Sequence, residues 1–148
     1  MTDMQTKAVE NAVWNPENAR GALHLGIDVG STTVKLAVLN DENAIVYAKY
    51  QRHHTDVRAC ARDLFEGAAS LLPEAQMTCA ITGSGGLLLS QWLGLEFVQE
   101  VIASKRAVET LIPQTDVAIE LGGEDAKIIY FEGGNVEQRM NGICAGGT

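Results

Sequence analysis

The segment Gly26–Lys35 combines an acidic residue with a turn of small residues that carry hydroxyl groups. Alternating aliphatic residues around Asp28 predict a strand, with this carboxylate on the face opposite the aliphatic row and close to the strand end. Gly30 permits a sharp turn, after which the backbone amides of residues 31–33 can point at one anion. The acid would order Mg²⁺ and its waters, and the turn would hold phosphate oxygens. This chemistry suits a metal-bound polyphosphate.

A second copy of the pattern occupies residues 119–127, at an offset of 92 residues (120 − 28). Asp28 corresponds to Glu120, and Lys35 corresponds to Lys127. The offset continues through the aliphatic run that follows each lysine. Two acid-bearing hairpins of this kind predict two similar lobes that face each other across a phosphate.

The composition narrows the classes of function. With 148 residues, 46% of them hydrophobic, the chain can bury the core of a globular domain. The formal charge of −8 argues against nucleic acid or an anionic membrane as a partner, although Mg²⁺ and backbone amides still allow ATP. No apolar run approaches the roughly 20 residues of a membrane span. The start lacks a secretory signal pattern, and three cysteines without a pairing pattern fit a reducing cytoplasm.

The order of patterns predicts an α/β fold. Strands are expected over residues 22–29, 33–39, 44–51 and 77–82, with the last parallel to the first, and then over 116–121, 126–131 and 136–140. Helices are expected from a Thr55 or Asp56 cap to about Leu72, over 87–93, and up to Leu111. The expected organisation is an N-terminal extension (1–21), a first lobe (22–112) and the opening meander of a second lobe (113–148). In the internal repeat, the last residues of the chain correspond to the point where the first lobe begins its first helix. This correspondence predicts a fragment of a longer protein.

Other residues allow more than one interpretation. Glu100, near a helix start, either stabilises the helix N-terminus or positions a water for attack on phosphate. The glycine loop over residues 83–86 is either a phosphate contact or a plain tight turn. Cys60 and Cys79 are expected to be inert core residues.

Three motifs carry a resemblance to a known family. Residues 28–33, "DVGSTT", and 120–125, "ELGGED", resemble the two phosphate motifs of the actin, Hsp70 and sugar-kinase superfamily, which has a ribonuclease H-like fold. Residues 141–148, "NGICAGGT", resemble the cysteine motif of the activators of 2-hydroxyacyl-CoA dehydratases and of the benzoyl-CoA reductase ATPase subunits, the BadF/BadG family. The resemblance runs from about Leu23 to Thr148 and is strongest to long-form activases.

The resemblance implies an ATPase that binds ATP and Mg²⁺. Asp28 and Glu120, the acids of the two motifs, would be catalytic. Glu100, considered above from its position near a helix start, would be the third catalytic residue. Phosphate binding would involve two turns and the lysine after the first, namely Gly30, Ser31, Thr32, Thr33, Lys35, Gly122, Gly123 and Asp125. Glu120 departs from the family, because short-form activators carry Asp at this position.

The resemblance also implies electron transfer in anaerobic metabolism. A homodimer would hold one [4Fe–4S] cluster through two cysteines per subunit, with Cys144 as the first ligand. ATP hydrolysis would drive an electron from this cluster to the iron–sulfur component of an acyl-CoA dehydratase or reductase, after delivery by ferredoxin or flavodoxin. The second cysteine would lie beyond Thr148, so no cluster is expected in the 148 residues. The alternatives are a small-molecule kinase or exopolyphosphatase of the same superfamily, or a nucleotide-sensing module without catalysis.

Overall fold

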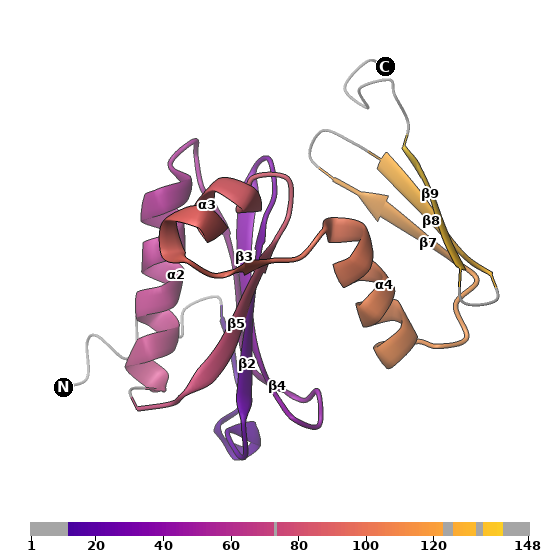
Figure 1. Ribbon diagram of the computed structural model, residues 1–148. Coiled ribbons are helices and arrows are strands. Elements are labelled where there is room, and N and C mark those ends of the chain that lie inside the picture. Colours follow the sequence, from indigo (N-terminus) through magenta and orange to yellow (C-terminus); the bar gives the residue numbers. More distant parts are fainter. Residues whose placement is uncertain (1–11, 73, 123–125, 133–134, 141–148) are drawn as a thin grey trace. The chain divides into compact units, whose positions relative to one another are not determined.

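The computed structural model describes residues 12–72, 74–122, 126–132 and 135–140 (Figure 1). The chain divides into two compact units, Met1–Phe97 and Val98–Thr148. None of the helices in the described ranges is long and apolar enough to cross a membrane.

The first unit is built on a six-stranded sheet with strand order β1-β4-β3-β2-β5-β6. Strands β2, β3 and β4 form the expected antiparallel meander, and β5 lies parallel to β2 as predicted. A short strand at each edge completes the sheet. The bounds are β1 (Ala12–Trp14), β2 (Leu23–Val29), β3 (Thr33–Asn40), β4 (Ile45–Arg52), β5 (Met77–Thr82) and β6 (Glu96–Phe97).

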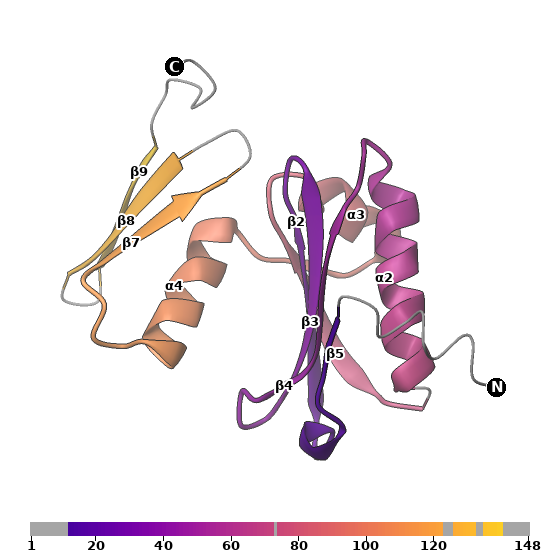
Figure 2. The same cartoon turned by 180° about the vertical axis from the view of Figure 1, so that it is seen from behind.

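Helix α2 (Val57–Leu71) covers one face of this sheet, as Figures 1 and 2 show from opposite sides. Asp56 caps the helix, because its Oδ1 accepts a hydrogen bond from the Ala59 amide at 2.9 Å. Four small or aliphatic residues on the helix are buried, as their spacing predicts. They pack against the inward row of β2 and β3, where Ile27 and Val34 are 1% and 0% exposed. The buried helix residues are Cys60, Ala61, Leu64 and Ala68.

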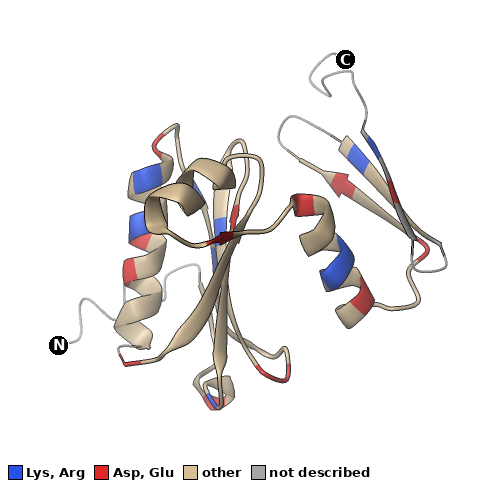
Figure 3. Cartoon of the chain, in the orientation of Figure 1, with Lys and Arg blue, Asp and Glu red and all other residues tan. Residues whose placement is uncertain are grey.

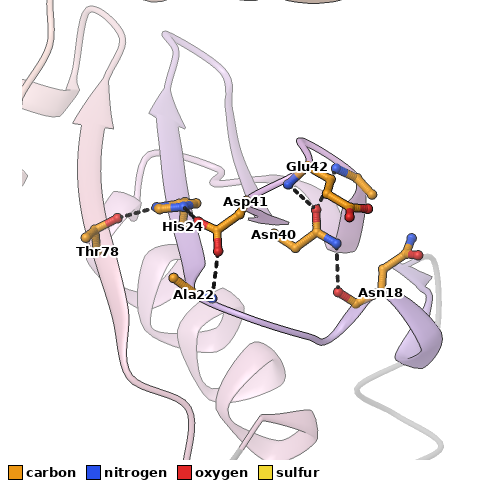
Figure 4. A network of polar contacts seen from close by, with 8 residues as sticks. Asn18, Ala22, His24, Asn40, Asp41, Glu42 and Thr78 are labelled. Atoms are coloured by element: carbon orange, nitrogen blue, oxygen red, sulfur yellow. Dashed lines mark hydrogen bonds and ion pairs between the residues drawn. The ribbon is translucent and has the colours of Figure 1, made fainter.

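A polar network joins the start of β2 to the β3–β4 hairpin (Figure 4). The two ring nitrogens of His24 lie 2.8 Å from Thr78 Oγ1 and 3.1 Å from Asp41 Oδ1. Asp41 also accepts a hydrogen bond from the Ala22 amide, and these two bonds, led by the one from His24, lower the pKa of the Asp41 carboxyl. The carboxamide oxygen of Asn40 accepts hydrogen bonds from the backbone amides of residues 42 and 44 and so closes the turn. This network fixes the end of the sheet opposite Asp28.

Two short elements near the N-terminus precede the first predicted strand. Strand β1 pairs with β4 and so extends the sheet, and Trp14 packs against the hydrophobic core. The 3₁₀ turn η1 (Pro16–Asn18) follows β1. The expectation that residues 1–21 lie outside the core is therefore wrong for β1, because three residues are too few to show a period of two. Cys79 also differs from expectation, because it is half-buried rather than buried.

Tyr47 of β4 is fully buried, and its hydroxyl has no hydrogen-bond partner among the described residues. A Cβ added at Gly67 of α2 would lie 3.0 Å from that hydroxyl, so the helix backbone packs against it. Burial raises the pKa of the Tyr47 phenol.

Tyr47→Phe should therefore raise the free energy of unfolding by about 1 kcal/mol, because it removes a desolvated polar group and keeps the ring. Urea denaturation of the 148-residue chain measures this change. Tyr50→Phe is the control, because Tyr50 lies in the same strand and is 55% exposed. A loss of stability for Tyr47→Phe would show that the hydroxyl is bonded in solution.

The second unit contains helix α4 (Glu100–Leu111) and a three-stranded antiparallel sheet. Its strands are β7 (Val117–Leu121), β8 (Ala126–Glu132) and β9 (Asn135–Met140), which confirms the predicted second meander. The expected first lobe extends to residue 112, whereas α4 falls in the second unit. The lobe boundary stays a prediction.

The two meanders share one register. Glu120 lies opposite Lys127 in the β7–β8 ladder, just as Asp28 lies opposite Lys35 in the β2–β3 ladder. The apolar faces differ in burial, however. Ile119 is 66% exposed, whereas its counterpart Ile27, covered by α2, is 1% exposed. The repeat read from the sequence is thus also a repeat of strand pairing.

Candidate functional site

Asp28 and Lys35 form an ion pair near the carboxyl end of β2. The distance from Lys35 Nζ to Asp28 Oδ2 is 2.7 Å, and the two side chains are 45% and 34% exposed. The other carboxylate oxygen, Oδ1, is buried and has no hydrogen-bond partner among the described residues. One carboxylate oxygen is therefore satisfied by the protein, and the other still lacks a hydrogen-bond partner among the described residues.

Strand β5 places a second buried oxygen, this time a hydroxyl, at this edge of the sheet. Thr82 is the parallel-ladder partner of Asp28, and its Oγ1 is also buried without a partner among the described residues. The next residue, Gly83, has φ +94°, and a Cβ there would overlap both Asp28 Oδ1 and the Val29 carbonyl. The glycine loop therefore lies directly on the Asp28 carboxylate, with no room for a side chain.

The loop is anchored by the backbone as well. The Gly85 amide donates to the Val29 carbonyl at 2.9 Å, and helix α3 (Gly86–Leu93) begins immediately after. Two buried oxygens that find no partner in the described part of the chain, on adjacent parallel strands, call for a polar ligand. A hydrated cation such as Mg²⁺ fits this donor set, because it binds carboxylates and keeps several waters.

The Gly30 turn lies between β2 and β3. Its backbone is held by a hydrogen bond from the Gly30 amide to the Thr33 carbonyl at 2.9 Å and by one from the His53 amide to the Thr32 carbonyl at 3.2 Å. Ser31 and Thr32 are exposed, as contact with a ligand requires. Thr33 is 7% exposed, so its side chain belongs to the packed interior of the first unit.

In the second unit, Lys127 brings two predicted acids together. Its Nζ lies 2.8 Å from Glu100 Oε1 and 3.7 Å from Glu120 Oε1. Gly122 is exposed at the end of β7. The predicted site residues Gly123, Asp125 and Cys144 lie outside the described residues.

Sequence reasoning did not include Thr82 or Lys127 among the site residues. A signal was present for each. Thr82 ends a strand predicted to be parallel to β2, and ligands of α/β sheets bind at the carboxyl ends of such strands. Lys127 occupies the position of Lys35 in the repeat.

The two described cysteines have an environment that disfavours the thiolate. Burial is the largest cause that raises the pKa of both thiols, and Asp63 and Asp56 raise the pKa of Cys60 further. Metals bind the thiolate form. This environment fits the predicted packing role of Cys60 and Cys79.

The charges on the helices are balanced locally. Figure 3 shows acidic and basic residues on both α2 and α4. Arg62 Nε lies 3.9 Å from Glu66 Oε1, and Lys105 Nζ lies 3.7 Å from Glu109 Oε1. Each pair has i,i+4 spacing. These exposed pairs contribute little stability and are not part of the site.

The first unit has a mixed sheet whose first hairpin carries an acid and a glycine turn, and the second unit repeats the acid-bearing hairpin. These features are typical of the actin, Hsp70 and sugar-kinase class of ATPase folds. The comparisons with known proteins agree with this class. Residues 25–148 match the BadF/BadG/BcrA/BcrD ATPase family, and the chain belongs to this family.

Several relatives are activators of dehydratases. The activator of lactoyl-CoA dehydratase from Anaerotignum propionicum is 33% identical over 129 residues, covering 84% of this chain and 49% of the relative. The (R)-2-hydroxyglutaryl-CoA dehydratase activating ATPase from Acidaminococcus fermentans is 31% identical over 127 residues, covering 84% and 48%.

A solved structure agrees with these relatives. Component A of the Acidaminococcus fermentans (R)-2-hydroxyglutaryl-CoA dehydratase superposes with a TM-score of 0.71 at 27% identity, covering 84% of this chain and 49% of that one. The chain spans about half the length of the curated relatives it matches.

Proposed function

We propose that the 148 residues form the N-terminal part of an ATP-dependent reductive activator, which couples ATP hydrolysis to electron transfer toward an acyl-CoA dehydratase or reductase. The observation that carries the proposal is the pair of buried oxygens on Asp28 and Thr82, beside the glycine loop, for which the described residues offer no hydrogen-bond partner. The family assignment supports the nucleotide, and the dehydratase activators among the relatives support the partner.

The first unit supplies the groups for Mg·ATP. Asp28 Oδ1 and Thr82 Oγ1 would hold waters of Mg²⁺, and Lys35 balances the charge of the Asp28 carboxylate. When bound, Mg²⁺ neutralises the charge that develops on the phosphates during hydrolysis. The exposed turn at Ser31 and Thr32 would direct backbone amides and hydroxyls at phosphate oxygens.

The second unit would supply further acids. Glu120 would hold further waters of Mg²⁺, with Gly122, Gly123 and Asp125 forming the second phosphate turn. Glu100 would orient the water that attacks the γ-phosphate. Because binding of Mg·ATP by two lobes favours their closed state, hydrolysis would change the lobe closure.

The electron-transfer part rests on the cysteine motif. Cys144 would be one of two ligands that each subunit of a homodimer gives to a [4Fe–4S] cluster. Lobe movement would then change the surroundings of the cluster and its docking to the acceptor iron–sulfur enzyme. The electron donor would be ferredoxin or flavodoxin, and the expected location is the cytoplasm.

Anaerobic purification of the full-length protein tests the function directly. It should hydrolyse Mg·ATP and show the visible absorption of an iron–sulfur cluster. Colourless protein that phosphorylates added metabolites would instead indicate a kinase. ATP binding without any turnover would indicate a nucleotide sensor, and either result would overturn the proposal.

Cys144→Ser in the full-length protein should remove the cluster and spare nucleotide binding, because a hydroxyl replaces the thiolate ligand. Iron content, visible absorption and ATP affinity are the measurements. Cys79→Ser is the matched control and should retain the iron, because burial disfavours the thiolate there. Retained iron in Cys144→Ser would place the ligands elsewhere.

A further inference from the structure

The two equivalent lysines of the repeat have different partners. In the first unit, Lys35 Nζ lies 2.7 Å from Asp28, the acid directly across the ladder. In the second unit, Lys127 Nζ lies 3.7 Å from Oε1 of Glu120, the acid across its ladder, but 2.8 Å from Oε1 of Glu100. The closer partner thus comes from the start of helix α4 rather than from the adjacent strand.

The surroundings of Lys127 favour a well-oriented ion pair. Its side chain is 13% exposed, compared with 45% for Lys35, and the Glu100 side chain is 32% exposed. Water screens such a pair less than it screens a pair on the surface, so the ammonium restricts the carboxylate more strongly. Glu100 is also the first residue of α4, where the helix N-terminus favours a negative charge.

The geometry points to Lys127 as the positioning residue that holds Glu100 in the orientation needed to direct the attacking water. This inference rests on the proposed ATPase function and deepens it. A carboxylate on a flexible side chain orients a water poorly, and a displacement of about 1 Å can reduce the rate about 100-fold. Lys127 acts through Glu100, and its ammonium also bridges toward Glu120, the acid of the second phosphate turn.

A double-mutant cycle on the full-length protein tests this role through Mg·ATP hydrolysis. Glu100→Gln and Lys127→Met should each lower kcat by about 10- to 100-fold, with KM for ATP changed less than about threefold. The double variant should lose much less than the product of the two single losses, because Lys127 then has no Glu100 carboxylate to orient. Lys127→Arg retains a cation and should restore most of the rate.

Arg139→Gln is the matched control. Arg139 also makes a 2.8 Å ion pair in the second unit, with Glu137, but the two side chains are 68% and 63% exposed. This variant should keep the wild-type kcat, because a surface pair restricts its carboxylate little.

The outcomes separate the inference from the function beneath it. Wild-type protein that hydrolyses no ATP would overturn the proposed function. Active wild type with a wild-type rate for Lys127→Met, or with losses that multiply in the double variant, would overturn the role of Lys127. A large rise in KM without a fall in kcat would show instead that Lys127 contacts the nucleotide.

If Lys127→Met does not fold, Lys127→Gln takes its place in the cycle. A rate for Lys127→Arg as low as that of Glu100→Gln would also overturn the inference.

Discussion

Gly83→Ala is expected to lower the free energy of unfolding of the first unit by roughly 2–4 kcal/mol. Two effects add. The residue has φ +94°, a conformation that disfavours any side chain, and the new Cβ would overlap Asp28 Oδ1 and the Val29 carbonyl. Backbone cannot move aside as a flexible side chain can, so the loop must shift away from the site.

Urea denaturation of the 148-residue chain measures this loss, and two other glycines separate its causes. Gly94 has φ +65° with open space around an added Cβ, so Gly94→Ala should cost only the conformational part, about 1 kcal/mol. Gly26 has open space and no positive φ, so Gly26→Ala should be close to neutral. Equal losses at Gly83 and Gly94 would show that the loop does not pack on Asp28.

Asp28→Asn should lower Mg·ATP hydrolysis by the full-length protein by at least about 100-fold. The carboxamide has nearly the same shape but no negative charge, so it would bind a hydrated Mg²⁺ poorly. The fold should persist, because the ion pair with Lys35 is partly exposed and contributes at most about 1 kcal/mol.

Steady-state hydrolysis as a function of Mg²⁺ concentration is the measurement. Asp41→Asn serves as the control, because Asp41 lies at the opposite end of the same sheet and should leave the rate unchanged. A normal rate in Asp28→Asn would refute the metal role of this carboxylate.

Local patterns predicted most of the elements. Alternation over residues 23–29 marked β2, and residues 77–82 match β5 at both ends. The stripe on α2 predicted its buried face, and the repeat predicted the shared register of the two meanders. These features are predictable because the period of hydrophobic residues records which face of an element is buried.

The short edge strands β1 and β6 were not predicted. With three and two residues, they are too short to show a period. The pairing of β1 depends on β4, which is distant in sequence, and that of β6 depends on β5, from which helix α3 separates it. The half-burial of Cys79 was missed for a related reason, because burial within a strand depends on what covers the sheet there.

By itself, the sequence determined the two acid-bearing hairpins, their offset, the order of strands and helices, and the resemblance to one ATPase family. Only the tertiary structure decided that Asp28 Oδ1 and Thr82 Oγ1 are buried without a partner in the described ranges. It also decided that Lys127 lies closer to Glu100 than to the acid across its ladder. The reason is physical. Periodicity depends on neighbours a few residues apart, whereas the partner of a side chain is set by packing between elements distant in the chain.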